Sequence, residues 1–458
     1  MSADAVLDLP LAGQAAVVAS GEVSPEELLE GALDRIESRN PALNAVVETF
    51  PERSHEMAAG APAGPLRGVP VVIKDEWPLP WRAHRFGWVA PPPGVEPGES
   101  GPYRALRDAG AVIAGVANMH EFGASSTGNY SAYGPARNPW DTDRCPGGSS
   151  SGPGSAVGGR IVAGAVGADG IGSIRYPAAY CGITGLKPTF GRSAMEGHHM
   201  KGTTTIVSGP LCTDAAGCRL LGSALYGEEL SPGDPAGLRI GVVGGPIAED
   251  NDPEVAAACE EAIQVLRAEA GGRLERIEVE GLELAGLAAV LVGTSEGLAS
   301  VTPQGLNALG EETGLINRSL FKYRQVLPAA ALVRAQRVRT LLRRSLARAF
   351  AEVDVIAWPT VPAPAPPLDG PVVELPSGPH TADEVNPRGG GLANLTGIPA
   401  ISVPVGLSSD GMPIGLQLQA AWGRDEVLLD AAEALERASG RRWVDAVPPL
   451  AGAAAAPD

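Results

Sequence analysis

Only four of the 35 basic side chains in this chain are lysines, and one of them, Lys74, directly follows the apolar run GVPVVI at 68–73. That run predicts a short buried strand. A lysine at the end of a buried strand loses hydration, which favours the neutral amine and would let Lys74 accept a proton. Two other interpretations stay open: the ammonium could reach the surface along its alkyl stem, or it could pair with Asp75.

Two segments rich in small residues could supply a hydroxyl for such a base. The first, PGGSSSG at 146–152, combines glycines that permit unusual backbone angles with serines that can relay protons, and it lacks the Gly-Lys-Ser/Thr ending of a phosphate loop. The second, DGIGSIRYP at 169–177, places Ser173 in a turn whose backbone N–H groups could converge on an oxyanion. Taken singly, each segment also fits an ordinary flexible loop or tight turn.

A nucleophilic serine needs a base, and histidine is the usual one. None of the histidines stands in a recognisable triad context; they are His55, His84, His120, His198, His199 and His380. Lysine is an established alternative base for serine, so the three segments together favour serine–lysine chemistry.

Hydrophobic periodicity predicts the elements that must position these residues. A helix begins after the capping Ser24 and closes at Asn40-Pro41, while 123–158 is predicted to be a long functional loop and 359–379 an extended proline-rich segment. Further helices are expected at 103–108, 253–269, 329–352 and 425–438, and strands at 111–115, 239–243, 353–357, 398–405 and 414–418. This alternation predicts one α/β domain over 1–450, built on a large mixed sheet, with a frayed tail at 451–458.

Composition narrows the classes of function. The chain has 458 residues, of which 44% are apolar, enough for a substantial core, and its net charge of −18 argues against direct binding to nucleic acid or an anionic membrane. Five cysteines without a Cys-x-x-Cys pair favour a reducing cytoplasm over a disulfide or zinc framework. We expect no signal peptide, no membrane span, no metal and no cofactor. Oligomeric state stays open, with a homodimer among the alternatives.

Seven short motifs occur in order across most of the chain. They are GVP…KD at 68–75, NPWD at 138–141, GGSS at 147–150, GSIR at 172–175, GLKP at 185–188, NLTGIP at 394–399 and PIGLQ at 413–417. In order and spacing, this set resembles the amidase signature family of serine hydrolases. The two serines, Ser149 and Ser173, stand 24 positions apart, as the family's catalytic serines do.

The resemblance implies a central mixed sheet covered by helices on both faces, and an amide hydrolase that works through an acyl-enzyme. Ser173 matches the nucleophile, Ser149 the bridging serine whose preceding peptide bond is cis, and Lys74 the terminal base. The backbone N–H groups of Gly170, Ile171, Gly172 and Ser173 match the oxyanion hole. A small-molecule amide is the implied substrate, and Phe122, Ser126 and His199 are the candidates for its pocket.

Two departures from the family pattern touch the expected site. Ile171 replaces one of two glycines before the nucleophile, and Ser151-Gly152-Pro153 stands where glycines usually follow the serine pair. We expect an active stand-alone amidase. The alternatives are the glutamine-hydrolysing A subunit of a tRNA-dependent amidotransferase and an inactive binding protein on the same scaffold. The segment 386–391 (NPRGGG) departs from the acidic sequence expected of the amidotransferase, which favours the stand-alone enzyme.

Overall fold

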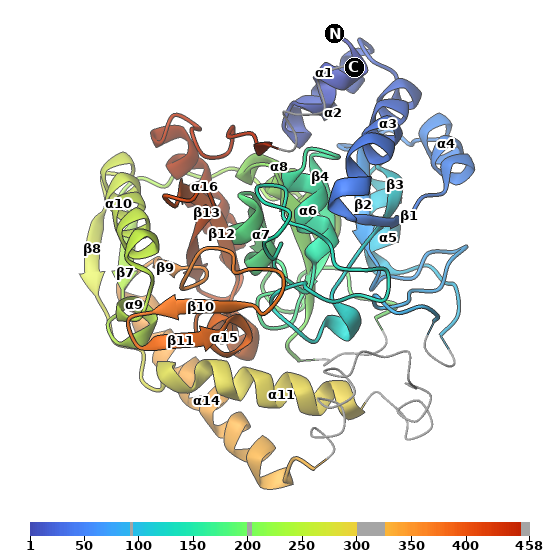
Figure 1. Cartoon of the computed structure of the whole chain (residues 1–458). Helices are drawn as coiled ribbons and strands as arrows, with labels where there is room; N and C mark the ends of the chain where they lie inside the picture. Colours follow the sequence, from blue (N-terminus) through green and yellow to red (C-terminus); the bar gives the residue numbers. More distant parts are fainter. Residues whose placement is uncertain (92–94, 199–203, 300–325, 450–458) are drawn as a thin grey trace.

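The computed structural model describes residues 1–91, 95–198, 204–299 and 326–449. The expected tail at 451–458 and the pocket candidate His199 lie outside the described residues. Within the described part, an 11-stranded mixed sheet runs through the whole chain in the order β1-β3-β2-β4-β6-β5-β12-β13-β9-β7-β8, and a hairpin of β10 and β11 stands apart (Figure 1). The predicted α/β class is therefore confirmed.

This sheet combines two parallel regions with a continuous antiparallel centre. Strand β2 is parallel to β3 and β4, and β7 is parallel to β8 and β9, whereas the central strands pair antiparallel. The strands are β1 (Val46–Glu48), β2 (Pro70–Lys74), β3 (Val112–Ala117), β4 (Gly164–Asp169), β5 (Thr184–Lys187), β6 (Val207–Cys212), β7 (Arg239–Val242), β8 (Arg273–Arg276), β9 (Val355–Pro359), β10 (Val372–Leu375), β11 (Gly378–Thr381), β12 (Ala400–Leu407) and β13 (Pro413–Ala420).

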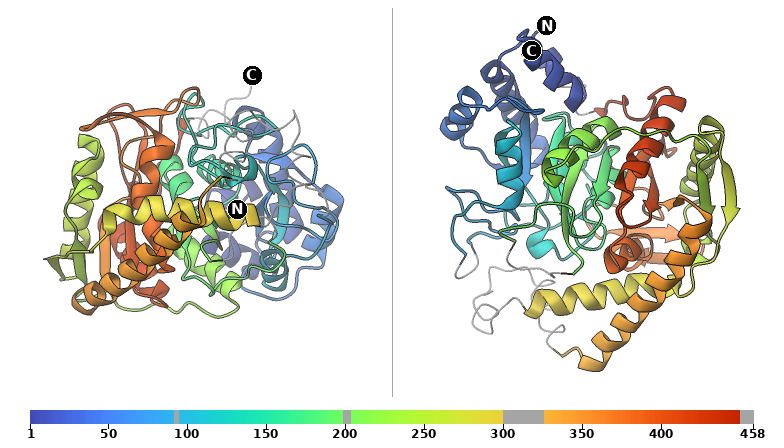
Figure 2. Two further views of the ribbon diagram at one scale, coloured as in Figure 1. Left: turned by 90° about the horizontal axis from the view of Figure 1, so that it is seen from below. Right: turned by 180° about the vertical axis from the view of Figure 1, so that it is seen from behind.

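Helices cover both faces of the sheet and close one end of it (Figure 2). They are α1 (Ala3–Leu7), α2 (Leu11–Ser20), α3 (Pro25–Leu43), α4 (Pro51–Ala59), α5 (Gly101–Asp108), α6 (Ser151–Gly158), α7 (Arg175–Cys181), α8 (Ala215–Tyr226), α9 (Pro246–Glu249), α10 (Pro253–Glu269), α11 (Ala285–Ala299), α14 (Ala329–Glu352), α15 (Ala382–Thr396) and α16 (Asp425–Ala438). One apolar core lies between the sheet and helices α5, α8, α10 and α16. A second core, on the opposite face, includes helices α3, α6 and α7. Helices α11, α14 and α15 form a third core below the sheet in Figure 1.

Local sequence signals explain several of these boundaries. Ser24 Oγ accepts from the amide of Glu27, and the Glu27 carboxylate accepts from the amide of Ser24, so α3 begins at the predicted capping box. The predicted end at Asn40-Pro41 is wrong, because α3 continues to Leu43 and ends at Asn44, which adopts a left-handed conformation. A proline in the last turn forfeits one backbone hydrogen bond, which the packing of Leu43 in the core offsets.

Two segments expected to lack regular structure form short elements. The predicted loop at 123–158 ends in helix α6, and the chain around the predicted extended segment 359–379 folds into the β10–β11 hairpin. Helix α6 forms despite its glycines and proline because it is completely buried against β4 and α7, so tertiary packing overrides weak helix propensity. No described helix has the length and apolar character needed to cross a membrane.

Candidate active site

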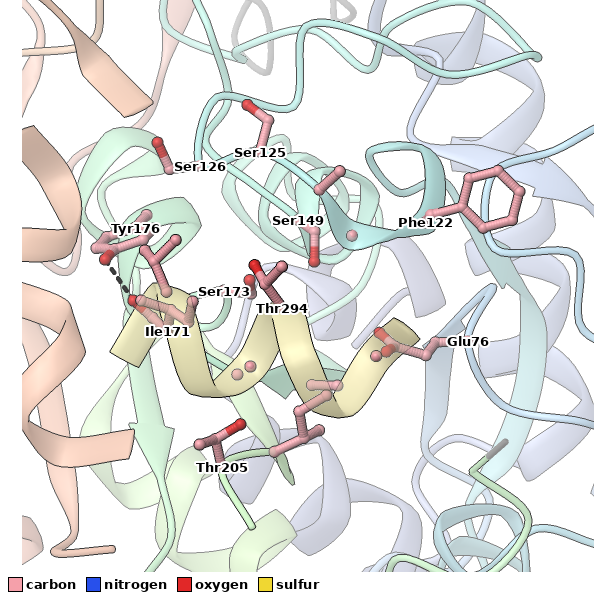
Figure 3. A pocket seen from close by; sticks show the side chains of 18 of the residues that line it. Glu76, Phe122, Ser125, Ser126, Ser149, Ile171, Ser173, Tyr176, Thr205 and Thr294 are labelled. Atoms are coloured by element: carbon pink, nitrogen blue, oxygen red, sulfur yellow. Dashed lines mark hydrogen bonds between the residues drawn. The ribbon is translucent and has the colours of Figure 1, made fainter. Parts of the chain in front are cut away.

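A cavity of about 280 Å³ lies where β2, the loop before α6, the β4–α7 turn and helices α11 and α15 meet (Figure 3). Lys74, Ser149 and Ser173 all line it, so the structure brings together the three residues that the sequence singled out. Its walls are mostly apolar. The larger apolar and aromatic side chains of these walls are Phe86, Phe122, Ile171, Tyr176, Ile206 and Val290.

Lys74 is the last residue of β2 and is completely buried. Successive side chains of a strand point to opposite faces, so Lys74 follows Val72 toward the α6 face while Ile73 lies in the core on the other face. Its Nζ lies 2.9 Å from Ser149 Oγ and 2.6 Å from a carboxylate oxygen of Glu76. The lysine therefore does not reach the surface.

Asp75 does not pair with Lys74, so that interpretation of the strand end is wrong. The Asp75 carboxylate instead accepts from Arg82 Nη1 at 2.6 Å and from the amides of Arg85 and Gly87. These bonds fix the loop that carries Phe86 into the cavity wall. Lys74 is thus left to face Ser149 and Glu76.

Ser149 reaches the cavity from the glycine-rich segment before α6. The Gly148–Ser149 peptide bond is cis, as the resemblance implies. The amide of Gly148 donates to Ser126 O, and the Ser149 carbonyl accepts from the amide of His120 at 3.0 Å. A Cβ at Gly148 would lie 2.7 Å from Gly128 N, so only glycine allows this close approach.

Ser173 lies in the β4–α7 turn, which a buried ion pair holds. The Asp169 carboxylate accepts from the amides of Gly172 and Ile174, on either side of Ser173, at 2.6 and 3.2 Å. Arg175 binds the same carboxylate at 3.0 Å, and both side chains are fully buried. Burial alone would raise the pKa of Asp169, but the Arg175 guanidinium and its hydrogen bonds, with Lys187 and Asn394, hold that pKa at about 2. The carboxylate is therefore ionised and fixes the backbone around the nucleophile candidate.

Comparisons with known proteins identify the family of this chain. A sequence model of the family described as Amidase matches residues 27–429. The chain belongs to the amidase family. A curated relative from Thermus thermophilus, the A subunit of a glutamyl-tRNA(Gln) amidotransferase, is 34% identical over 94% of this chain and 97% of its own length. The class of chemistry is accordingly amide hydrolysis.

Two solved structures extend this finding to the fold. A structure described as an amidase superposes with a TM-score of 0.88 at 30% identity, covering 94% of this chain and 99% of its own. A 6-aminohexanoate cyclic dimer hydrolase in complex with substrate superposes with a TM-score of 0.83 at 27% identity, covering 97% and 99%. The predicted amidase signature fold is thus confirmed.

The oxyanion hole expected of an amidase needs one revision. The amide of Gly172 donates to Asp169 Oδ1 and is therefore not available to a substrate oxygen in this structure. Gly172 matters for another reason, because its φ of +126° and the Tyr176 ring, 2.1 Å from an added Cβ, both require glycine. Gly170, Ile171 and Ser173 remain the candidates.

The two departures from the amidase pattern fit the site without distorting it. Ile171 is not among the described residues with positive φ, so its backbone does not need the left-handed conformation that favours glycine. Its carbonyl accepts from the Tyr176 hydroxyl (Figure 3). Pro153 is the third residue of α6, in the first turn, where the missing N–H would have no partner inside the helix.

Two of the three pocket candidates, Phe122 and Ser126, lie at the cavity, and the third, His199, lies outside the described residues. Phe122 is buried and lines the cavity beside Phe86. Ser126 also lines it and is held by Asp383, whose carboxylate accepts from the Ser126 amide and hydroxyl at 2.6 and 2.7 Å.

Several residues that line the cavity were not among those that the sequence patterns indicated. Glu76 stands only two positions after Lys74, which was a usable signal, whereas Asp383 on α15 and the α11 residues Val290 and Thr294 gave none. Their approach depends on contacts across more than a hundred residues of chain, which no local pattern encodes.

Proposed function

We propose that this amidase hydrolyses a neutral carboxamide through a Ser173 acyl-enzyme, with Ser149 as the proton bridge and Lys74 as the base. The observation that carries the proposal is the 2.9 Å contact between Lys74 Nζ and Ser149 Oγ, fully buried in the cavity that also holds Ser173. The amide of Ser150 donates to the Ser173 carbonyl at 3.2 Å, which ties the two serine segments together.

The reaction follows from this order of groups. Neutral Lys74 takes the proton of Ser149 while Ser149 takes that of Ser173, and Ser173 Oγ attacks the amide carbonyl. The backbone amides of Gly170, Ile171 and Ser173 stabilise the oxyanion, where one donor is typically worth about 2.7–4 kcal/mol. The proton returns through Ser149 to the leaving nitrogen, and water then releases the acid by the same relay.

The cavity supports an apolar acyl group without a free carboxylate. Phe86, Phe122 and Ile206 are apolar, and among the described lining residues the only cation is Lys74, which the relay uses. Glu76 and Asp383 add negative charge to the same walls. An acyl group with its own carboxylate would therefore meet repulsion rather than a partner.

The alternative is the glutamine-hydrolysing A subunit of a tRNA-dependent amidotransferase. The Thermus thermophilus relative is named as such an amidotransferase component, and its 34% identity over nearly the full length favours this function. Against it stands the cavity, because the α-carboxylate of glutamine finds no cation other than Lys74 on the walls that the structure describes. We therefore place the stand-alone amidase first, acting on a small molecule in the cytoplasm without contacting nucleic acid directly.

Labelling with a fluorophosphonate probe tests the proposal without knowledge of the substrate. The wild type should become labelled at Ser173, while Ser173→Ala and Lys74→Ala should not. A panel of aryl, alkyl, cyclic and peptide amides then defines the substrate. Glutaminase activity together with co-purifying partner proteins would replace our first choice by the amidotransferase component. If the folded protein showed neither labelling nor turnover, the binding-protein alternative would be left.

A further inference from the structure

Glu76 and His198 continue the buried polar contacts of the proposed relay beyond Lys74. One carboxylate oxygen of Glu76 lies 2.6 Å from Lys74 Nζ, and the other lies 2.8 Å from Nε2 of His198. The side chains of Lys74, Glu76 and His198 are 1%, 2% and 5% exposed, so all three groups interact away from bulk water. Glu76 also lines the active-site cavity (Figure 3).

The charges of this cluster bear directly on the base. A carboxylate beside Lys74 stabilises the ammonium, which is the form that cannot accept a proton. An imidazolium at His198 would offset the charge of Glu76 and so favour the neutral amine. Glu76 and a protonated His198 would thus act on the Lys74 amine in opposite directions.

We propose that Glu76 and His198 are positioning residues that jointly orient the Lys74 amine and set the charge beside it. The inference rests on the proposed function, because it concerns the base of that relay. Glu76 fixes the direction of the Lys74 amine toward Ser149, and His198 balances the negative charge that Glu76 places beside it. Only protons are redistributed, and no bond between heavy atoms forms or breaks.

The apolar surroundings of Glu76 and His198 strengthen these electrostatic effects. The rings of Trp77 and Phe86 pack 5.2 and 6.3 Å from that of His198, so apolar groups flank the imidazole. Asp75, next to Lys74 in sequence, is turned away to Arg82. Among the residues that the structure describes, His84, His120 and Glu121 are further buried ionisable groups on the loops packed around Phe86, and they are unchanged in every variant below.

The pH dependence of Ser173 labelling by the fluorophosphonate probe tests the proposal. The variants are Glu76→Gln and His198→Gln, each of which keeps a hydrogen-bonding side chain while removing a titratable group, and the double variant. A charge of opposite sign at such range typically moves a titration by about 1–3 pH units. We compare the pH at which labelling reaches half of its maximal rate. Relative to the wild type, this pH should fall by about one unit or more in Glu76→Gln and should rise in His198→Gln. The double variant should behave like Glu76→Gln.

A matched control is Glu436→Gln, another buried glutamate that lies on α16 and accepts from the amide of Ala215, away from the cavity. Its profile should follow the wild type. Shifts of Glu76→Gln and His198→Gln in the same direction, or profiles that match the control, would overturn the proposal. If the proposed function itself were wrong, the wild type would not be labelled at any pH. That result differs from failure of the Glu76 and His198 proposal, in which the wild type is labelled.

Discussion

Asparagine in place of Asp169 should weaken both the fold and the proposed nucleophile. In the wild type, that carboxylate accepts from the amides of Gly172 and Ile174 and from the buried Arg175. Its pKa is lowered from 3.8 to about 2. At about 1.4 kcal/mol per unit, this shift corresponds to about 2–3 kcal/mol of stability at neutral pH.

The loss on mutation should be somewhat larger than the shift alone, because Asp169→Asn leaves the Arg175 guanidinium buried without its counter-ion. Removing one partner of a buried pair typically costs about 3–5 kcal/mol. We therefore expect the free energy of unfolding in urea to fall by about 3 kcal/mol or more at pH 7. Since the folded-state pKa is depressed, this contribution is present above pH 3.8 and is lost as pH falls toward 2. The difference between the two proteins should narrow in that window.

The labelling rate of Ser173 supplies the functional measurement. With the amides on both sides of Ser173 less firmly held, displacement of the hydroxyl should slow labelling by about 10²-fold. Asp430→Asn is the control, because Asp430 likewise accepts from an arginine, Arg219, and from the amide of Gly233, far from the cavity. It should lose stability and keep the wild-type labelling rate. A stability change of less than about 0.5 kcal/mol in Asp169→Asn, or unchanged labelling, would refute the reasoning.

Two further predictions concern single positions. Gly172→Ala should slow labelling, because Gly172 has a φ of +126° and the new methyl would lie 2.1 Å from Tyr176 Cζ. The control Gly191→Ala, at φ +87° with open space around it, should lower stability only. Equal labelling rates in the two variants would contradict the proposed clash. Burial, aided by Asp214, raises the pKa of Glu436 to about 8, so the unfolded chain loses this proton well before the folded one does. The free energy of unfolding should therefore fall between about pH 5 and 8 in the wild type and be flatter in Glu436→Gln, and an equal slope in both would reject the assignment.

Several residues at the cavity could be predicted from the sequence because they stand in local patterns. A lysine after an apolar strand and a serine in a turn of small residues are patterns of a few neighbouring positions. Both Lys74 and Ser173 lie in the cavity as expected. The spacing of Ser149 from Ser173 matched a known family, which supplied their order in the relay.

Helix α15 shows why other parts could not be predicted. It contains Pro387 and three successive glycines, which local propensity reads as a break. In the fold, a Cβ at Gly390 would lie 2.1 Å from the Tyr176 hydroxyl, so the glycines allow the helix to approach the Ser173 turn. The contact of Glu76 with His198 likewise joins residues 122 positions apart.

The wall that α11 forms has a consequence for how this enzyme could be diversified. The residues of the proposed relay come from 74–173, whereas Val290, Gly293, Thr294 and Gly297 line the cavity from a helix far along the chain. An added Cβ at Gly293 would meet Ile171 and Thr205 side chains only at ordinary van der Waals distance, 3.7 Å. Libraries randomised at these α11 positions can therefore reshape the acyl pocket while the bond-breaking groups stay in place, which separates selection for new substrates from selection for catalytic competence.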